Sequence, residues 1–189
     1  MLTMTDDETL TDDETLARRA GTGDREAFEA LLERHYDRVY RIGHRLLGNP
    51  TEAEDLAQDI CVGLAKKLRS YRGDSLFTTW LYRVTVNAAR DVLRRRATSN
   101  RLDQSFGETA ALVKAGDEAR QSESRWLHDA LQALGEDLRE TGLLVLSEEL
   151  KHAEAGEILG VKEATVSWCM HEVRKQLKAL AEAGDGVST

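Results

Sequence analysis

The chain has 189 residues, 41% of them apolar and 32% charged, which allows one ordinary domain or two small ones. Its 26 Lys and Arg against 34 Asp and Glu give a net charge of −8, so the chain as a whole is a poor binder of polyanions. Two cysteines without CxxC spacing exclude a disulfide framework, and the sequence has neither a long apolar run nor the apolar core of a signal peptide. We therefore expect a cytoplasmic protein with no membrane insertion of its own.

Residues 1–23 are predicted to form an acidic N-terminal segment with one short helix. The motif TDDETL occurs twice in succession there, and a repeat this short does not indicate a solenoid. The helix would run to about Ala20 and be capped by Thr11, Asp12 or Asp13, since acidic side chains suit the positive end of a helix.

Residues 24–96 are predicted to form a module of three helices, because apolar residues recur there at three- and four-residue spacing. Asp24 would cap the first helix, which ends at about Leu47 before Gly-Asn-Pro. The TEAE pattern at 51–54 resembles a capping box that opens the second helix. A SYRGDS loop follows, and the third helix would cover 77–96.

A polar, weakly periodic stretch at 97–122 is predicted to be a flexible linker. Residues 123–183 would form a second helical module, and 184–189 a frayed tail. The sequence thus predicts an all-α protein of two small modules, which we expect to move as separate bodies. The helices expected in the second module cover 123–134, 136–146, 151–159 and 163–183.

The string ILGVKEATV in the second module is typical of a helix-turn-helix. Gly160 stands where a tight turn needs positive φ, and Val161 would fill the gap between the helices. The helix from Glu163 would then enter a major groove. An ordinary helical hairpin is the alternative interpretation.

Residues 66–101 carry ten basic residues and two acidic ones, which is the local charge that nucleic-acid binding needs. A solvated basic face is the alternative. Phe77 and Trp80 lie on the apolar face of their helix, so we interpret them as core rather than as stacking platforms for bases. Tyr71 and Arg72, in the loop, are expected to be exposed.

The second helix carries an acidic face that would either bind a basic protein surface or be merely solvated. Catalysis finds no support, because the sequence has no P-loop, no GxSxG motif and no histidines at metal-binding spacing. We therefore predict no enzymatic activity, no cofactor and no metal. This acidic face comprises Glu52, Glu54, Asp55, Gln58 and Asp59.

Residues 24–96 resemble region two of the sigma-70 family, in its small extracytoplasmic-function (ECF) group, through EAEDLAQD, TWLYRV and NAARDVLRRR in this order. Residues 131–180 resemble region four, through LQALGEDLRETGLLVL and the helix-turn-helix string. Regions one and three are absent, as in the ECF group.

The resemblance implies a sigma factor that directs core RNA polymerase to specific promoters for transcription initiation. Region two of such a factor docks on the β′ clamp helices and opens the −10 element. Region four contacts the β flap and reads the −35 element. An anti-sigma factor usually holds such proteins inactive. The alternative is a sigma mimic that sequesters an anti-sigma factor without binding DNA.

The resemblance assigns roles by position. Contact with core polymerase falls on Glu54, Asp55, Gln58 and Asp59. Contact with −10 DNA falls on Tyr71, Arg72, Gly73, Asp74, Ser75, Trp80, Arg83, Asn87, Arg90 and Arg94. Contact with −35 DNA falls on Lys162, Glu163, Thr165, Ser167, Trp168, His171 and Arg174.

The predicted recognition helix departs from the family, because no Lys or Arg stands between Val166 and Arg174. Each missing cation removes a phosphate contact, so we expect weak −35 binding. Cys169 stands where many relatives carry Arg. The substitution Cys169→Arg is therefore predicted to strengthen −35 binding. The alternative is that Cys169 is buried, in which case Arg would overpack the motif.

Overall fold

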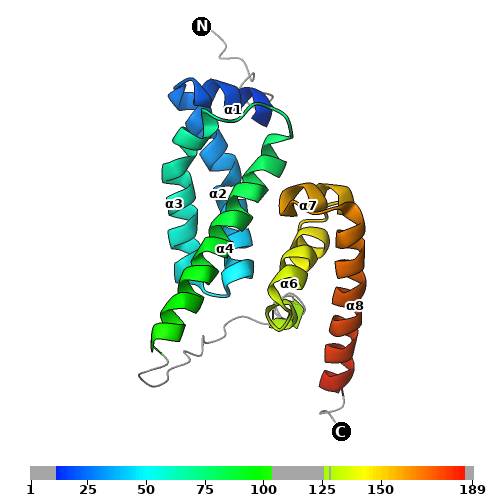
Figure 1. Cartoon of the computed structure of the whole chain (residues 1–189). Coiled ribbons are helices and arrows are strands. Elements are labelled where there is room, and N and C mark those ends of the chain that lie inside the picture. The colour runs from blue at the N-terminus through cyan, green and yellow to red at the C-terminus, as the bar shows by residue number, and fades with distance from the viewer. Residues whose placement is uncertain (1–11, 104–125, 128, 186–189) are drawn as a thin grey trace, which may run out of the picture.

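The computed structural model describes residues 12–103, 126–127 and 129–185. These residues form helices and turns without any strand, which confirms the all-α class. The helices form two groups, an N-terminal and a C-terminal one (Figure 1). Most of the predicted linker and tail, and the first TDDETL copy, lie outside the described residues. None of the helices described is long and apolar enough to span a membrane.

Helix α1 (Asp13–Gly21) lies across one end of the N-terminal group (Figure 1). Asp12 is the cap among the three candidates, since its side chain accepts a hydrogen bond from the Thr15 amide at 2.6 Å. A Cβ atom at Gly21 would lie 2.8 Å from the Leu68 carbonyl oxygen, so only glycine allows α1 to approach the end of α3 (Pro50–Leu68) this closely.

Helices α2 (Arg25–Leu47), α3 and α4 (Phe77–Asp103) form the rest of the N-terminal group. Asp24 caps α2 as predicted. The predicted capping box at 51–54 is wrong, because α3 begins earlier: Asn49 caps it through the Thr51 and Glu52 amides. Pro50 fits the first helical position, where no amide donor is needed.

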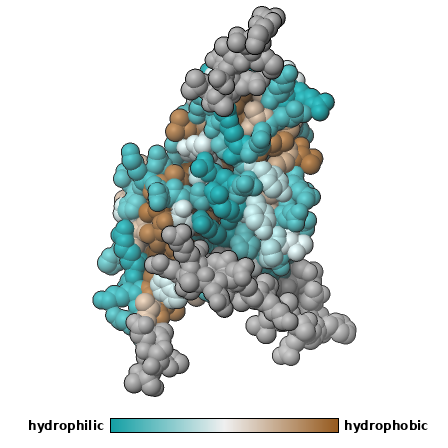
Figure 2. All heavy atoms as spheres, turned by 180° about the vertical axis from the view of Figure 1, so that it is seen from behind, coloured by the Kyte–Doolittle hydropathy of each residue, from teal (hydrophilic) through white to brown (hydrophobic). Residues whose placement is uncertain are grey.

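The core of the N-terminal group consists of apolar side chains from all four helices. Helix α4 continues seven residues past residue 96, into the predicted linker. Viewed from behind, hydrophilic residues cover most of the described surface, with smaller hydrophobic areas between them (Figure 2). The largest fully buried side chains of this core include Leu31, Ile42, Leu46, Leu68, Phe77 and Val86.

The C-terminal group contains helical residues 126–127 and 129–132, then α6 (Glu136–Gly142), α7 (His152–Leu159) and α8 (Glu163–Asp185). The single helix expected over 136–146 instead changes after Gly142 into a π-helical turn, η1 (Leu143–Ser147).

The turn between α7 and α8 has the predicted geometry at Gly160, whose φ is 72°. Val161 does not fill the gap between the two helices, because it is exposed. The close approach is made by Gly156 instead, where a Cβ atom would lie 2.9 Å from the Val161 carbonyl oxygen.

The two groups are in contact, contrary to the expectation of independent bodies. Helix α4 runs beside α7. At the other end of the contact, the Arg139 guanidinium donates to the Leu46 carbonyl at 3.3 Å, and the Gln132 side-chain amide donates to the Arg45 carbonyl. Sequence periodicity could not reveal this contact, because it joins residues far apart in the chain.

Candidate polymerase and nucleic-acid interfaces

The four residues predicted to contact polymerase lie together on the exposed face of α3. The opposite face buries Leu56 and Ile60 in the core. One turn further along α3, Val62 is 84% exposed, an apolar addition to this face that sequence reasoning missed. Beside the acidic face, a groove of about 500 Å³ lies between α3 and residues 92–96 of α4, and Arg96 lies 3.7 Å from Glu52 across it.

The loop before α4 is held by an aromatic cluster. The Tyr71 hydroxyl donates to the Ser75 carbonyl at 2.8 Å, and its ring lies 6.0 Å from that of Phe77 and 5.5 Å from that of Trp80. Phe77 is fully buried, which confirms its core role, and Trp80 is half-buried. Tyr71 is half-buried too, so the prediction that it is exposed is wrong, whereas Arg72 is exposed as predicted. The exposed residues of the loop are Ser70, Arg72, Gly73, Asp74 and Leu76.

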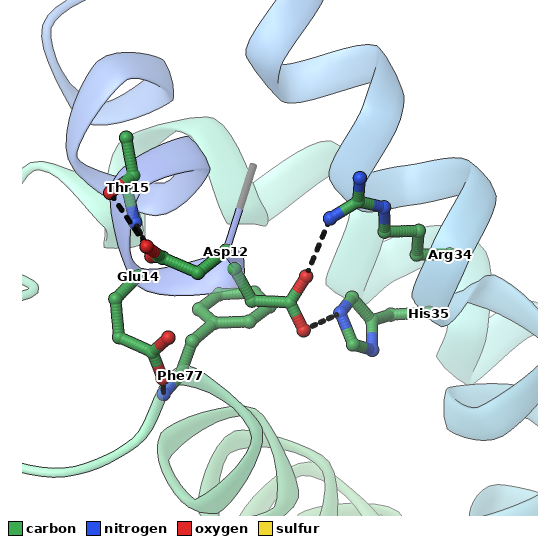
Figure 3. Close-up of polar contacts among 7 residues, drawn as sticks. Asp12, Glu14, Thr15, Arg34, His35 and Phe77 are labelled. Carbon is green, nitrogen blue, oxygen red and sulfur yellow. Dashed lines mark hydrogen bonds and ion pairs between the residues drawn. The ribbon is translucent and has the colours of Figure 1, made fainter. Parts of the chain in front are cut away.

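Helix α1 fixes the start of α4, directly after this loop (Figure 3). The Glu14 carboxylate accepts a hydrogen bond from the Phe77 amide at 2.9 Å and so caps α4 from 63 residues away. Asp13 binds Arg34 at 3.0 Å and His35 at 2.8 Å, which ties α1 to α2. The sequence assigned these acids only a capping role for α1.

His35 is buried between these elements, with its ring 5.2 Å from that of Phe77 in an edge-to-face arrangement. Burial lowers the pKa of His35, while the neighbouring Asp13 carboxylate opposes this shift. Two arginines close by, Arg34 and Arg38, also favour the neutral ring. The histidine therefore supports the start of α4 in its uncharged form.

Two of the five predicted DNA contacts on α4 are engaged by the C-terminal group. The Arg90 guanidinium donates two hydrogen bonds to Glu140 of α6, of which the Nε–Oε1 bond is 2.8 Å long. Arg83 donates to the Glu157 carbonyl of α7 at 3.0 Å. Asn87 is exposed, and Arg94 pairs with Asp91 at 2.9 Å on the solvent side.

Glu140 is only 3% exposed. Burial raises the pKa of Glu140, and the hydrogen bonds from Arg90 oppose that shift. The same hydrogen bonds raise the pKa of Arg90. Removing Arg90 while the two groups stay in contact would leave a buried carboxylate without its partner, which is costly.

A second buried carboxylate joins both helix groups. Glu148 accepts from the Tyr82 hydroxyl of α4 at 2.7 Å and from Arg45 of α2 at 3.1 Å, and its side chain is 6% exposed. Burial and the bond to Glu148 raise the pKa of Tyr82, so the phenol stays a donor. Sequence reasoning missed Glu148 because its partners are 66 and 103 residues away.

All seven residues predicted for −35 contact are exposed on or just before α8. Val166, Met170 and Val173 are buried on its other side. Trp168 is 65% exposed, so its large ring is available for contact on this side of α8. Ser167 is oriented by His152 of α7, since its hydroxyl lies 2.9 Å from the imidazole Nδ1.

The two cysteines lie in different helix groups. Cys61 of α3 is half-buried, and Cys169 of α8 is 6% exposed. The burial of Cys169 favours the alternative that Arg there would overpack the motif, over the expectation that it would strengthen −35 binding. Among the described residues, no cluster of His, Cys, Asp and Glu suits a metal ion.

Comparisons with known proteins agree with this geometry. The Sigma-70 region 2 family model matches residues 31–98. The chain is 35% identical over 166 residues to the ECF RNA polymerase sigma factor SigE of Mycolicibacterium smegmatis, a match that covers 83% of this chain and 63% of SigE. It is 30% identical over 173 residues to the ECF RNA polymerase sigma factor SigW of Bacillus subtilis, covering 84% of this chain and 92% of SigW.

Among solved structures, the fold is similar to that of CnrH in complex with the cytosolic domain of CnrY. The TM-score is 0.70 at 25% sequence identity, and the match covers 90% of this chain and 97% of CnrH. The similarity extends over both helix groups, since the matched share exceeds either group alone.

Proposed function

The chain belongs to the ECF sigma factors of the sigma-70 family, and from this premise we propose that it binds core RNA polymerase and directs it to particular promoters. Sigma factors are not enzymes, and the polymerase performs the chemistry. Its place of action would be the cytoplasm, where the polymerase is. The proposal rests mainly on helices α4 and α8, because each of them contains one of the two predicted DNA-binding faces.

We assign −35 recognition to the exposed face of α8. The buried side of α8, with Val166 and Met170, fixes the helix in the motif and leaves the polar side turned outward. Trp168 and His171 would contact base edges and sugars, since only Lys162 and Arg174 of the predicted set can contact phosphate as cations.

We assign −10 recognition to the loop before α4 and to the arginines of α4. The exposed Arg72 would bind the strand backbone, while the half-buried Trp80 and Tyr71 offer ring edges for an unstacked base. The exposed acidic face of α3 is the proposed contact with the β′ clamp helices, and the C-terminal group would contact the β flap. The likeness to CnrH in complex with the cytosolic domain of CnrY supports an anti-sigma factor as a further partner.

Run-off transcription tests the proposal. Core polymerase supplemented with the full chain should initiate at defined starts whose upstream sequences share two elements, and core polymerase alone should not. A chain that binds core but yields no defined start would contradict promoter recognition. If it binds an anti-sigma factor but neither core nor DNA, the sigma-mimic alternative is correct.

A further inference from the structure

His152, the first residue of α7, lies outside the set of residues predicted to contact DNA. Its imidazole Nδ1 lies 2.9 Å from the hydroxyl oxygen of Ser167, on the exposed face of α8. We propose that His152 is a positioning residue for −35 recognition: it accepts the hydrogen bond of the Ser167 hydroxyl and thereby restricts the base edge that Ser167 reads. The inference rests on the proposed assignment of −35 recognition to α8.

The position of Ser167 on α8 is suited to contact with a base. Ser167 lies four residues after Glu163 and four residues before His171, so these three side chains follow one another along one side of the helix. All three are exposed, whereas Val166 and Val173 are buried. In a helix-turn-helix, the first turns of the second helix contact the base edges of the major groove. The hydroxyl therefore faces the groove and not the core.

The hydroxyl of Ser167 has a different kind of partner from other hydroxyls in these helices. Thr85 and Thr141 each donate their hydroxyl proton to the main-chain carbonyl four residues earlier, at 2.9 and 2.8 Å. In the described part of the chain, Ser167 is paired instead with an imidazole of the neighbouring helix. Because a hydroxyl has one proton and two lone pairs, this pairing decides what remains for a further partner.

The imidazole thus sets the polarity of the contact with DNA. When Nδ1 accepts the hydrogen bond of Ser167, the hydroxyl retains lone pairs only, and it can accept from the amino group of adenine or cytosine. It can no longer donate to guanine O6 or thymine O4, which are acceptors in the major groove. A serine without such a partner can donate or accept, and it therefore discriminates poorly between bases. The selectivity of this contact would come from His152, which need not touch the DNA.

Two local features fix the position of the imidazole. The main-chain amide of Lys151, directly before His152, donates to the Glu154 carboxylate at 2.8 Å and so holds the first turn of α7. Gly156 lets α7 approach α8 closely, since a Cβ atom there would lie 2.9 Å from the Val161 carbonyl oxygen. The distance between the imidazole and the hydroxyl is therefore set by the packing of the helix-turn-helix itself.

This hydrogen bond contributes little to folding. Ser167 is exposed and His152 is half-buried, so water replaces either partner in the free protein at small cost. Water is displaced when a base edge covers the hydroxyl, and a group with the wrong polarity is then left unpaired. Loss of the imidazole should therefore change base selectivity much more than stability, which separates a positioning role from a structural one.

The test compares holoenzymes on a promoter mapped by run-off transcription, in which each −35 base pair is replaced in turn by the other three. His152→Ala should lower the discrimination at one base pair by about threefold to tenfold and change the affinity for the original promoter less than about twofold. His152→Asn should retain most of the discrimination, because its amide oxygen can accept the same hydrogen bond. Melting curves of both variants should be close to that of wild type.

A second background tests whether the two residues act as a pair. In Ser167→Ala holoenzyme the discrimination at this base pair should already be lost, and adding His152→Ala should change it no further. Additive effects of the two substitutions would overturn the proposal, because His152 would then act without Ser167. Equal weakening of all promoter variants by His152→Ala would also overturn it, since a phosphate contact or a damaged motif has that effect.

The Ser167→Ala holoenzyme also separates this inference from the proposed function on which it rests. If this variant keeps every base preference of wild type in the −35 element, Ser167 does not read DNA, and its assignment to −35 recognition is wrong together with the role of His152. If Ser167→Ala relaxes the preference at one base pair and His152→Ala does not, the −35 assignment holds and only the positioning role of His152 is wrong.

Discussion

Helices α4 and α8 are both predicted to read DNA, yet among the described residues only the predicted DNA face of α4 is covered by another helix group. The seven predicted residues of α8 are exposed, whereas Arg83 and Arg90 of α4 contact glutamates of the C-terminal group. The comparison teaches that exposure in the free protein is a poor guide to a nucleic-acid interface. A surface made for phosphates also attracts the chain's own carboxylates.

The difference between the two helices has its origin in charge density. The stretch 66–101 carries ten basic residues against two acidic ones, so it creates a strong local field in an otherwise acidic protein. The outward face of α8 has no Lys or Arg between residues 166 and 174, so it offers fewer cations to the carboxylates of the C-terminal group. We expect α8 to depend on shape and base contacts, and α4 on charge.

Loss of polymerase binding would remove the proposed DNA contacts of both helices at once, because we propose that they act in the holoenzyme. Asp55→Lys combined with Asp59→Lys reverses two exposed charges on α3 and should abolish co-purification with core polymerase. Helicity and melting temperature should change little, since exposed substitutions away from caps and core have small effects. Retained co-purification would show that the acidic face of α3 is only solvated.

The charge dependence of α4 can be measured as a salt slope. Replacing Arg94, Arg95 and Arg96 by Ala removes three exposed cations and should flatten the salt dependence of holoenzyme binding, by up to about 0.9 for each phosphate that is no longer neutralised. The control is Arg25→Ala, an exposed arginine of α2 that pairs with Glu29. A triple variant with the wild-type slope would place these arginines outside the DNA interface.

Cys169→Arg tests whether α8 tolerates added charge. Because Cys169 is buried, we expect Arg to destabilise the helix-turn-helix by about 1–3 kcal/mol and to weaken −35 binding. Ser167→Arg, on the exposed side of the same helix, is the matched comparison and should leave the melting temperature nearly unchanged. Tighter −35 binding by a stable Cys169→Arg protein would refute the burial argument.

The smallest expected effect concerns the pH dependence of the N-terminal group. The pKa of His35 is lowered in the folded state, so below about pH 6.5 the unfolded chain takes up a proton that the folded chain does not. Stability should therefore decrease as the pH falls from about 6.5 through the lowered pKa. His35→Gln should reduce this decrease.

Asp13→Asn provides the opposite change. It removes the carboxylate that holds the pKa of His35 up, so the melting temperature should fall more steeply with acidification than in wild type. Melting curves at several pH values measure both variants. Parallel curves for wild type and the two variants would mean that His35 does not control the pH dependence.

Local sequence signals predicted the helices well, because capping and periodicity act over a few residues. Asp24 caps α2 and Gly160 makes the turn before α8, both as expected. The same signals failed at the start of α3. The TEAE pattern predicted a capping box there, but Asn49 is the cap and Pro50 follows it at the first helical position.

The covered face of α4 could not be predicted in the same way. Glu140 lies in the string GEDLRE, which looks like an exposed acidic helix, and its partner Arg90 is 50 residues earlier in the chain. Likewise, spacing placed Cys169 at the edge of the DNA-facing side, and only the packing against the preceding helices decides that it is buried. Pairings over such distances depend on tertiary structure.

Each helix group contains one cysteine, so the reaction rates of the two thiols can report local unfolding of the chain. A thiol reagent can reach the half-buried Cys61 by small fluctuations, although burial raises the pKa of this thiol and slows its reaction. Cys169 becomes accessible only when the helix-turn-helix itself opens. Labelling rates followed by peptide mass spectrometry would thus report the opening of the helix-turn-helix at Cys169, with Cys61 as a reference that needs only small fluctuations, in one unmodified molecule and also within the holoenzyme.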